Sequence, residues 1–347
     1  MRILTTFIAI TLSLAFAEVS AAPAPATAPA RAERVIIGGK AVAMVADAAY
    51  LFPQAGSAVI AVAGVDQGLG SFLAAIDPGF AKKPVLDRAA GAEVFASYAP
   101  DLVILKSSMK KSVGPGLDAV GIKQLYLDLE TPEDYLRELS FLGQVFGDSD
   151  RAAALTEFYR RKLDDVGSRA SRAVAGGDGR PRVLVLQAQA APGGVFEVPP
   201  ESWMQTILTE RAGGLPVWKG ANPGSGWARV GIEQIAAWDP DVVFCISYKD
   251  KAGDVAAAFR ADPRLAGLRA IATGKVFGFP QDFYSWDQPD ARWILGLGWM
   301  AKKLHPAAFA SVSTMGEARG FYEFCYGISP TTFEALIAPR LSGDYGD

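Results

Sequence analysis

An internal repeat constrains the fold of this chain more than any other feature of its sequence. Residues 91–107 align without gaps to residues 231–247, at a constant offset of 140 positions. Each copy predicts a short amphipathic helix, a Pro-Asp turn and a buried strand that ends in a polar loop. Such a unit is half of a βαβ crossover, so the repeat predicts two similar parallel-sheet lobes. The identical pairs are Gly91/Gly231, Glu93/Glu233, Ala96/Ala236, Pro100/Pro240, Asp101/Asp241, Val103/Val243 and Ser107/Ser247.

Further apolar runs extend both predicted sheets. Residues 34–38, 58–62 and 124–127 are expected to be strands of the first lobe, and residues 181–187 and 275–279 strands of the second. These runs are apolar on both faces, which is typical of a sheet covered by helices on both sides.

One long helix is predicted between the lobes. Its start can be capped by Asp148 or Ser149, a broken apolar stripe follows, and the glycines from Gly176 onward end it. About 25 helical residues would span ~37 Å, enough to bridge two lobes. The predicted fold is therefore α/β, with two doubly wound lobes of mostly parallel sheet, one bridging helix and a ligand cleft between the lobes. The predicted boundaries are 34–147 for the N-terminal lobe, 148–178 for the helix and 179–347 for the C-terminal lobe.

The N-terminus predicts export. Residues 1–21 have a basic start, an apolar stretch and small residues suited to cleavage, and residues 22–33 form a Pro/Ala-rich linker. An uncleaved anchor is the alternative. No later run is long and apolar enough to span a membrane, and no Cys near the cleavage point could carry a lipid, so we expect a soluble exported protein that is not membrane-anchored.

Composition excludes several classes of function. The net charge of −3 and the lack of a basic run argue against nucleic-acid binding. His305 is the sole histidine, so the chain has almost no candidate residues for a His-based zinc site or a Ser-His-Asp triad. Cys245 lies in an apolar run and Cys325 is distant in sequence; we expect two buried free thiols, and a disulfide between them stays open. No intrinsic cofactor, metal site or catalytic activity is predicted.

The repeated Gly-x-Glu…Pro-Asp unit, the bridging helix and the segment 286–306 together resemble the periplasmic substrate-binding proteins of ABC importers for iron-siderophore, haem and cobalamin. The resemblance covers residues 34–335. It implies a monomer in the periplasm whose partners are an ABC permease, the ATPase of that permease and a small metal chelate. It also implies that Glu93 and Glu233, one on each lobe, dock on the permease. The alternative for these glutamates is that each only sits in the first turn of a helix.

Ligands of parallel sheets bind beyond the carboxyl ends of the strands, which predicts a site in loops that face each other across the cleft. Aromatic side chains in polar loops suit a bulky, partly apolar chelate, and Lys and Arg near the strand ends favour an anionic one such as a ferric carboxylate or catecholate. Trp203, Trp293 and Trp299 are expected in the core. The predicted ligand-binding residues are Lys40, Ser108, Lys110, Trp227, Arg229, Tyr248, Tyr284 and Trp286.

Four alternatives to a siderophore receptor are considered from the sequence. Haem would need an axial ligand, for which Tyr248 or Tyr284 is available, and cobalamin would need only the aromatic wall. A periplasmic sensor subunit would use the same pair of lobes. An enzyme on this scaffold would need a Cys set, several His or a close pair of acids, and only Asp282 and Asp287 come close together in the predicted loops.

Overall fold

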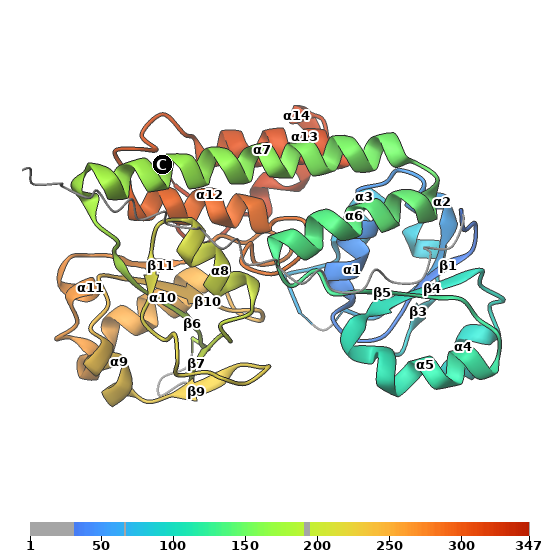
Figure 1. The fold of residues 1–347 in the computed structure, drawn as a ribbon, viewed down its shortest axis with the longest axis horizontal. Coiled ribbons are helices and arrows are strands. Elements are labelled where there is room, and N and C mark those ends of the chain that lie inside the picture. Colours follow the sequence, from blue (N-terminus) through green and yellow to red (C-terminus); the bar gives the residue numbers. More distant parts are fainter. Residues whose placement is uncertain (1–30, 66, 191–194, 347) are drawn as a thin grey trace, which may run out of the picture.

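Two α/β lobes lie side by side beneath a layer of long helices (Figure 1). The structure is a computed structural model that describes residues 31–65, 67–190 and 195–346. The predicted fold class is confirmed. The predicted signal peptide and most of the predicted linker lie outside the described residues. Among the residues described, no helix is long and apolar enough to cross a membrane.

The N-terminal lobe contains a five-stranded parallel sheet in the order β3-β2-β1-β4-β5. Side chains alternate between its two faces. Val35 and Ile37 join the core beneath α1 and α6, whereas Ile36 joins a second apolar cluster with Phe95 of α4 and Leu117 of α5. Its strands are β1 (Val35–Ile37), β2 (Val59–Ala63), β3 (Val85–Leu86), β4 (Leu102–Lys106) and β5 (Gln124–Leu127).

The C-terminal lobe contains a six-stranded sheet with the order β11-β10-β6-β7-β9, and β8 pairs with β6. The strands β11, β10, β6 and β8 are parallel, and β7 and β9 form an antiparallel extension. The strands are β6 (Arg182–Gln187), β7 (Phe196–Val198), β8 (Leu215–Pro216), β9 (Ala228–Val230), β10 (Val242–Ile246) and β11 (Val276–Gly278).

Helices cover both faces of the sheets and form the layer that connects the lobes (Figure 1). In the N-terminal lobe they are α1 (Val42–Ala49), α2 (Ala55–Ala58), α3 (Phe72–Ile76), α4 (Ala92–Ala96), α5 (Lys110–Ala119) and α6 (Pro132–Phe146). The remaining helices are α7 (Ser149–Ala173), α8 (Met204–Arg211), α9 (Ile232–Trp238), α10 (Ala252–Ala261), α11 (Arg269–Ala272), α12 (Trp293–Leu304), α13 (Thr314–Tyr326) and α14 (Pro330–Leu336).

The bridging helix is α7, which has 25 residues and runs across both lobes (Figure 1). Asp148 caps it, because its side chain accepts a hydrogen bond from the Arg151 N–H at 2.9 Å. A π-helical turn at Val174–Asp178 ends it, and Gly177 in this turn has a φ of 115°. Near its start, the Arg151 guanidinium donates to the carbonyls of Leu51 and Cys325, so α7 ties the N-terminal lobe to α13.

The two sequence repeats occupy equivalent places in the two lobes. In the first, the Asp101 carboxylate accepts from the Arg34 N–H at 2.9 Å, directly before β1. In the second, the Asp241 carboxylate accepts from the N–H of Arg182, the first residue of β6, at 2.8 Å. Each Pro-Asp turn thus fixes the start of the strand beside it. The two repeats therefore play the same structural role in their lobes, as the predicted duplication implies.

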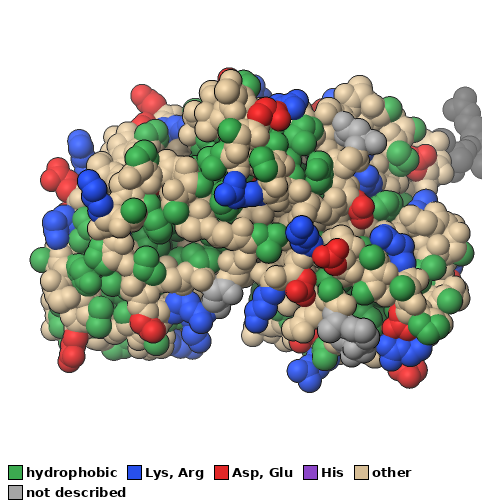
Figure 2. Space-filling model, turned by 180° about the vertical axis from the view of Figure 1, so that it is seen from behind, with side chains coloured by type: hydrophobic (Ala, Val, Ile, Leu, Met, Phe, Trp, Pro, Cys, Tyr) green, Lys and Arg blue, Asp and Glu red, His purple; other side chains and the backbone are tan. Residues whose placement is uncertain are grey.

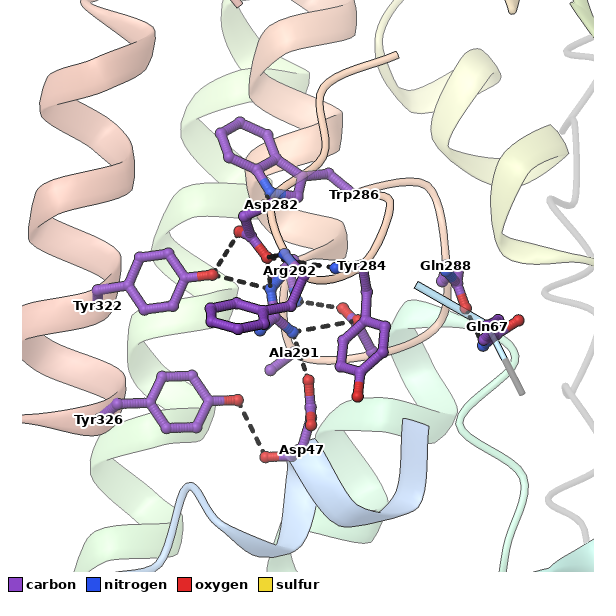
Figure 3. Close-up of polar contacts among 12 residues, drawn as sticks. Asp47, Gln67, Asp282, Tyr284, Trp286, Gln288, Ala291, Arg292, Tyr322 and Tyr326 are labelled. Atoms are coloured by element: carbon purple, nitrogen blue, oxygen red, sulfur yellow. Dashed lines mark hydrogen bonds and ion pairs between the residues drawn. The ribbon is translucent and has the colours of Figure 1, made fainter. Parts of the chain in front are cut away.

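A buried ionic network lies where the lobes and the last helices meet (Figure 3). The Arg292 guanidinium contacts the carboxylates of Asp282 at 2.8 Å, of Asp290 at 3.2 Å and of Asp47 in α1. The Tyr322 hydroxyl of α13 also donates to Asp282. Because Asp47 belongs to the first lobe and Arg292 precedes α12, this network fixes how the lobes sit against each other.

Burial shifts the pKa of two carboxyls in this network. It raises the pKa of Asp47 to about 6 and that of Asp290 to about 8, although the Arg292 charge acts in the opposite direction. One guanidinium therefore shares a buried site with three carboxyls, and the raised pKa of Asp290 favours the neutral form of this carboxyl.

Both cysteines are buried free thiols, as predicted. Burial raises the pKa of Cys245 and of Cys325. His305, as expected, is a structural residue: its ring is fully buried at the end of α12.

Candidate functional site

A notch separates the two lobes on the side away from α7, and we call it the interlobe cleft (Figure 2). The loops that follow β4 and β5 lie at the carboxyl edge of the N-terminal sheet, and the loop that follows β10 lies at the carboxyl edge of the C-terminal sheet. This is the position expected for a ligand site at the carboxyl ends of parallel strands.

The floor of the cleft is closed by residues 67–69, which hydrogen-bond to the opposite lobe. The Gly68 N–H donates to the Tyr248 carbonyl at 3.0 Å, and the Leu69 N–H donates to the Phe283 carbonyl at 2.7 Å. The side chains of Gln67 and Gln288 meet at 2.5 Å (Figure 3). A glycine is required at position 68, because φ is 90° and a Cβ atom would lie 2.4 Å from the Phe283 carbonyl oxygen.

The N-terminal wall presents an ion pair. The Lys106 ammonium at the end of β4 lies 2.7 Å from the Glu130 carboxylate. Behind this pair, Glu138 of α6 accepts hydrogen bonds from the N–H groups of Asp128 and Leu129, both at 2.9 Å. Burial raises the pKa of Glu138 to about 7. Glu138 therefore holds the turn that positions Glu130.

The C-terminal wall is aromatic. The ring centroid of Trp227 lies 5.8 Å from that of Trp203 and 6.1 Å from that of Tyr248, and neighbouring rings stand nearly perpendicular, at 82° and 63°. All three side chains are partly exposed. We call these three residues the aromatic corner. Large rings left half open to a cleft, next to a few polar groups, are typical of small-molecule sites.

A buried carboxylate supports the aromatic corner from behind. Asp287 accepts hydrogen bonds from the Tyr248 hydroxyl at 2.8 Å and from the Gln205 side-chain amide at 2.9 Å. Burial raises the pKa of Asp287, and its neutral donors lower it only in part. The corner and this carboxylate form one hydrogen-bonded unit.

The predicted basic residues and Ser108 lie at exposed positions in both lobes. Lys40, Ser108 and Lys110 are exposed at the ends of β1 and β4, and Arg229 is exposed on β9. Figure 2 shows Lys and Arg side chains on both walls of the notch. The Lys110 ammonium lies over the Tyr126 ring and the Arg229 guanidinium lies 3.8 Å from Glu197, so neither is buried in a structural ion pair.

Three aromatic residues lie elsewhere than predicted. Tyr284 and Trp286 are each only 1 % exposed, so their rings belong to the core and not to an open wall. The reason is the Arg292 network: the Trp286 indole N–H donates to Asp282 at 2.9 Å, and the Arg292 guanidinium lies 5.3 Å from the Tyr284 ring centroid (Figure 3). Trp203, which we expected in the core, is partly exposed in the aromatic corner. Trp293 and Trp299 are core residues, as predicted.

Sequence reasoning missed Gln205, Glu130 and the role of Asp287. Asp287 was recognisable only as an acid in a polar loop, with nothing to distinguish it from Asp282. Gln205 lies one residue into α8 and carries no local pattern that marks it. Only the tertiary fold brings its side-chain amide to the Asp287 carboxylate.

Glu93 and Glu233 occupy matching surface positions. Each is exposed in the first turn of the repeat helix, α4 or α9, and the burial pattern along the two helices is the same over residues 91–98 and 231–238. The surroundings differ in one respect. The Glu233 carboxylate folds back towards Gly231, and its charge helps to raise the pKa of Arg264. No side chain approaches Gly91 in this way.

The architecture defines a two-lobe binding protein in which a rigid helix connects the lobes. The family described as Periplasmic binding protein matches residues 87–283, more than half of the chain, and the chain belongs to this family. No curated protein matches the chain in sequence.

Solved structures share the fold across nearly the whole chain. An ABC transporter solute-binding protein from Sulfurospirillum deleyianum is 20 % identical with a TM-score of 0.72, covering 90 % of this chain and 96 % of the other. Helicobacter pylori CeuE, solved with Ni(II) bound, is 17 % identical with a TM-score of 0.69 and coverages of 88 % and 94 %. A periplasmic haem-binding protein from Pseudomonas aeruginosa is 19 % identical with a TM-score of 0.59 and coverages of 80 % and 94 %. The chain is thus a member of the Periplasmic binding protein family and shares its fold with these solute-binding proteins.

Proposed function

We propose that this protein captures a metal chelate, a ferric siderophore in particular, in the interlobe cleft and delivers it to an ABC permease. The observation that carries the proposal is the partly exposed aromatic corner of Trp203, Trp227 and Tyr248, which adjoins the other lobe where the Gly68 N–H donates to the Tyr248 carbonyl. A bulky chelate with apolar or aromatic groups can stack on these rings.

The basic residues at the mouth favour an anionic chelate. Lys40 and Lys110 of the N-terminal lobe and Arg229 of the C-terminal lobe are exposed and can contact carboxylate or catecholate oxygens. Within the residues described, no group of three or more acid, His or Cys side chains could hold a metal ion.

Haem is a weaker candidate than a siderophore for this site. The Tyr284 ring is buried, and the Tyr248 hydroxyl already donates to Asp287. An axial bond from either tyrosine would require this packing to open. Cobalamin needs no axial tyrosine and is kept as a test ligand.

The ligand class is tested by titration of tryptophan fluorescence with ferric catecholate, ferric citrate, ferric hydroxamate, haemin, cyanocobalamin and molybdate. We expect saturable binding of at least one ferric chelate and a loss of about tenfold or more in affinity for Trp227→Leu, because a hot-spot aromatic is removed. Trp238→Phe, on α9, is the matched control and should bind as the wild type does. Binding of haemin, cobalamin or molybdate alone would reject the siderophore proposal.

We further propose that Glu93 and Glu233 dock on the permease, since two exposed carboxylates on equivalent corners suit a two-fold partner. The double variant Glu93→Ala/Glu233→Ala should bind the chelate normally and fail to support uptake in vesicles that contain the permease and its ATPase. Glu157→Ala, an exposed glutamate of α7, is the control. Normal uptake by the double variant would reject the docking assignment, and binding without any permease-dependent uptake would favour a sensor.

A further inference from the structure

Asp287 differs from the other buried acids around it, because no cation compensates it. It is 1 % exposed, and among the residues described no Lys, Arg or His forms a salt bridge with it. Tyr248 and Gln205 donate to one oxygen. The other oxygen, Oδ1, has no partner of ordinary hydrogen-bond geometry in the described part of the chain, although the Ser285 hydroxyl is near enough to lower its pKa.

The second observation is the shape of the aromatic corner in front of this carboxylate. Trp203 and Trp227 stand at 82° to each other and Trp227 and Tyr248 at 63°, so the corner offers ring faces from more than one direction. A buried acceptor beside it, the Gln205 side-chain oxygen, also has no hydrogen-bond partner among the described residues.

These features all favour a bound cation. The faces of Trp and Tyr rings are negative and attract cations, most strongly where water is excluded. The Tyr248 hydroxyl donates a hydrogen bond to Asp287, which leaves more electron density on the phenol ring. A buried carboxylate without a counter-ion is stabilised either by a proton or by a cation.

We propose that the aromatic corner, backed by Asp287 and Gln205, is a subsite for an organic ammonium group. The inference rests on the proposed function in that the subsite occupies the same cleft, and it narrows the ligand class. The chelate has two ends: anionic oxygens that meet the basic residues at the mouth, and an ammonium group that enters the aromatic corner.

On the opposite wall the Glu130 carboxylate is paired with the Lys106 ammonium at 2.7 Å, and this ammonium also donates to the Asp128 carbonyl. This pair is charge-compensated, in contrast to Asp287.

A simple probe tests the subsite without knowledge of the natural chelate. We compare n-hexylammonium with 1-hexanol, which has the same apolar chain and no charge, by isothermal titration calorimetry and by quenching of tryptophan fluorescence. The wild-type protein should bind the ammonium about tenfold more tightly than the alcohol. Asp287→Asn and Trp227→Leu should abolish this preference, Trp227→Phe should keep most of it, and the exposed control Asp254→Asn should not change it.

A second pair of probes connects the subsite to the chelate. A ferric trihydroxamate with a terminal primary ammonium should bind about tenfold more tightly than the same chelate with this amine acetylated, and Asp287→Asn should bind the two equally.

The possible outcomes separate the two proposals. If hexylammonium and hexanol bind the wild-type protein equally, or if Asp287→Asn keeps the preference for the ammonium, the subsite is rejected whether or not ferric chelates bind. If the ammonium preference depends on Asp287 and Trp227 but no ferric chelate binds, the subsite stands and the siderophore proposal fails.

Discussion

The loop between β11 and α12 carries an acidic cluster and one separate acid, and they are built in opposite ways. Asp282 and Asp290 surround the Arg292 guanidinium, which is fully buried and also reaches Asp47 of the other lobe. Asp287 lies between them in sequence, yet only neutral donors contact it, and it lies behind the partly exposed aromatic corner. The cluster is compensated by a cation, as a structural element requires. The separate Asp287 has no such cation, which is the environment that we propose for a binding subsite.

The substitution with the largest expected effect removes Arg292 from the compensated cluster. Arg292→Leu leaves buried carboxylates without their cation, so we expect a loss of about 3–5 kcal/mol in the free energy of unfolding. Urea denaturation followed by circular dichroism measures this loss. A variant as stable as the wild type would show that the network does not hold the lobes together.

Trp286 and Trp227 test the same contrast with aromatic residues. Trp286→Ala removes a fully buried ring and should lower the free energy of unfolding by about 3–5 kcal/mol. Trp227→Ala removes a partly exposed ring, so it should cost about 1 kcal/mol or less in stability and weaken ligand binding. Thermal unfolding and ligand titration of both variants provide the comparison. The reverse result, in which Trp286→Ala is stable and deficient in binding, would restore the role predicted from sequence.

The pH dependence of stability tests the buried carboxyls. Burial raises the pKa of Asp290 from the ordinary 3.8 to about 8, so the folded state holds a proton that the unfolded chain releases. Stability from this group is therefore present at low pH and is lost as pH rises from about 4 to about 8. Asp290→Asn should make the fall in Tm over this range smaller than in the wild type, with Asp254→Asn as control. Equal slopes for the wild type and Asp290→Asn would contradict the assignment.

The smallest effect on stability is expected at Asp287. Asp287→Asn keeps an oxygen that can accept from Tyr248 and Gln205 and removes a charge that has no counter-ion. The free energy of unfolding should change by about 1 kcal/mol or less, while ligand binding weakens. A loss as large as that of Arg292→Leu would place Asp287 among the structural acids.

The sequence predicted the fold well because the fold depends on local patterns. The repeat, the apolar strands and a helix cap at Asp148 or Ser149 each follow from sequence patterns. The structure contains the repeat and the strands and has Asp148 as the cap. The predicted lobe boundaries stay predictions; the structure adds that α13, from the end of the chain, contacts the first lobe through the Tyr326 hydroxyl and the Asp47 carbonyl.

The site was predicted less well because its residues are selected by tertiary packing. Trp286 and Trp227 lie in similar Gly/Pro/Asp-rich loops, but only the position of Arg292, more than two hundred residues from Asp47, decides which ring is enclosed. Asp287 likewise lacks a counter-ion because the Arg292 guanidinium contacts Asp47, Asp282 and Asp290 instead. No local pattern contains this information.

Native mass spectrometry of the protein isolated from the periplasm of an iron-limited culture tests the central claim most directly. The account predicts an adduct with the isotope pattern of an iron chelate on the wild-type chain and its loss from the Trp227→Leu chain. An iron-chelate adduct that the Trp227→Leu chain retains in full would contradict the assignment of the ligand to the interlobe cleft.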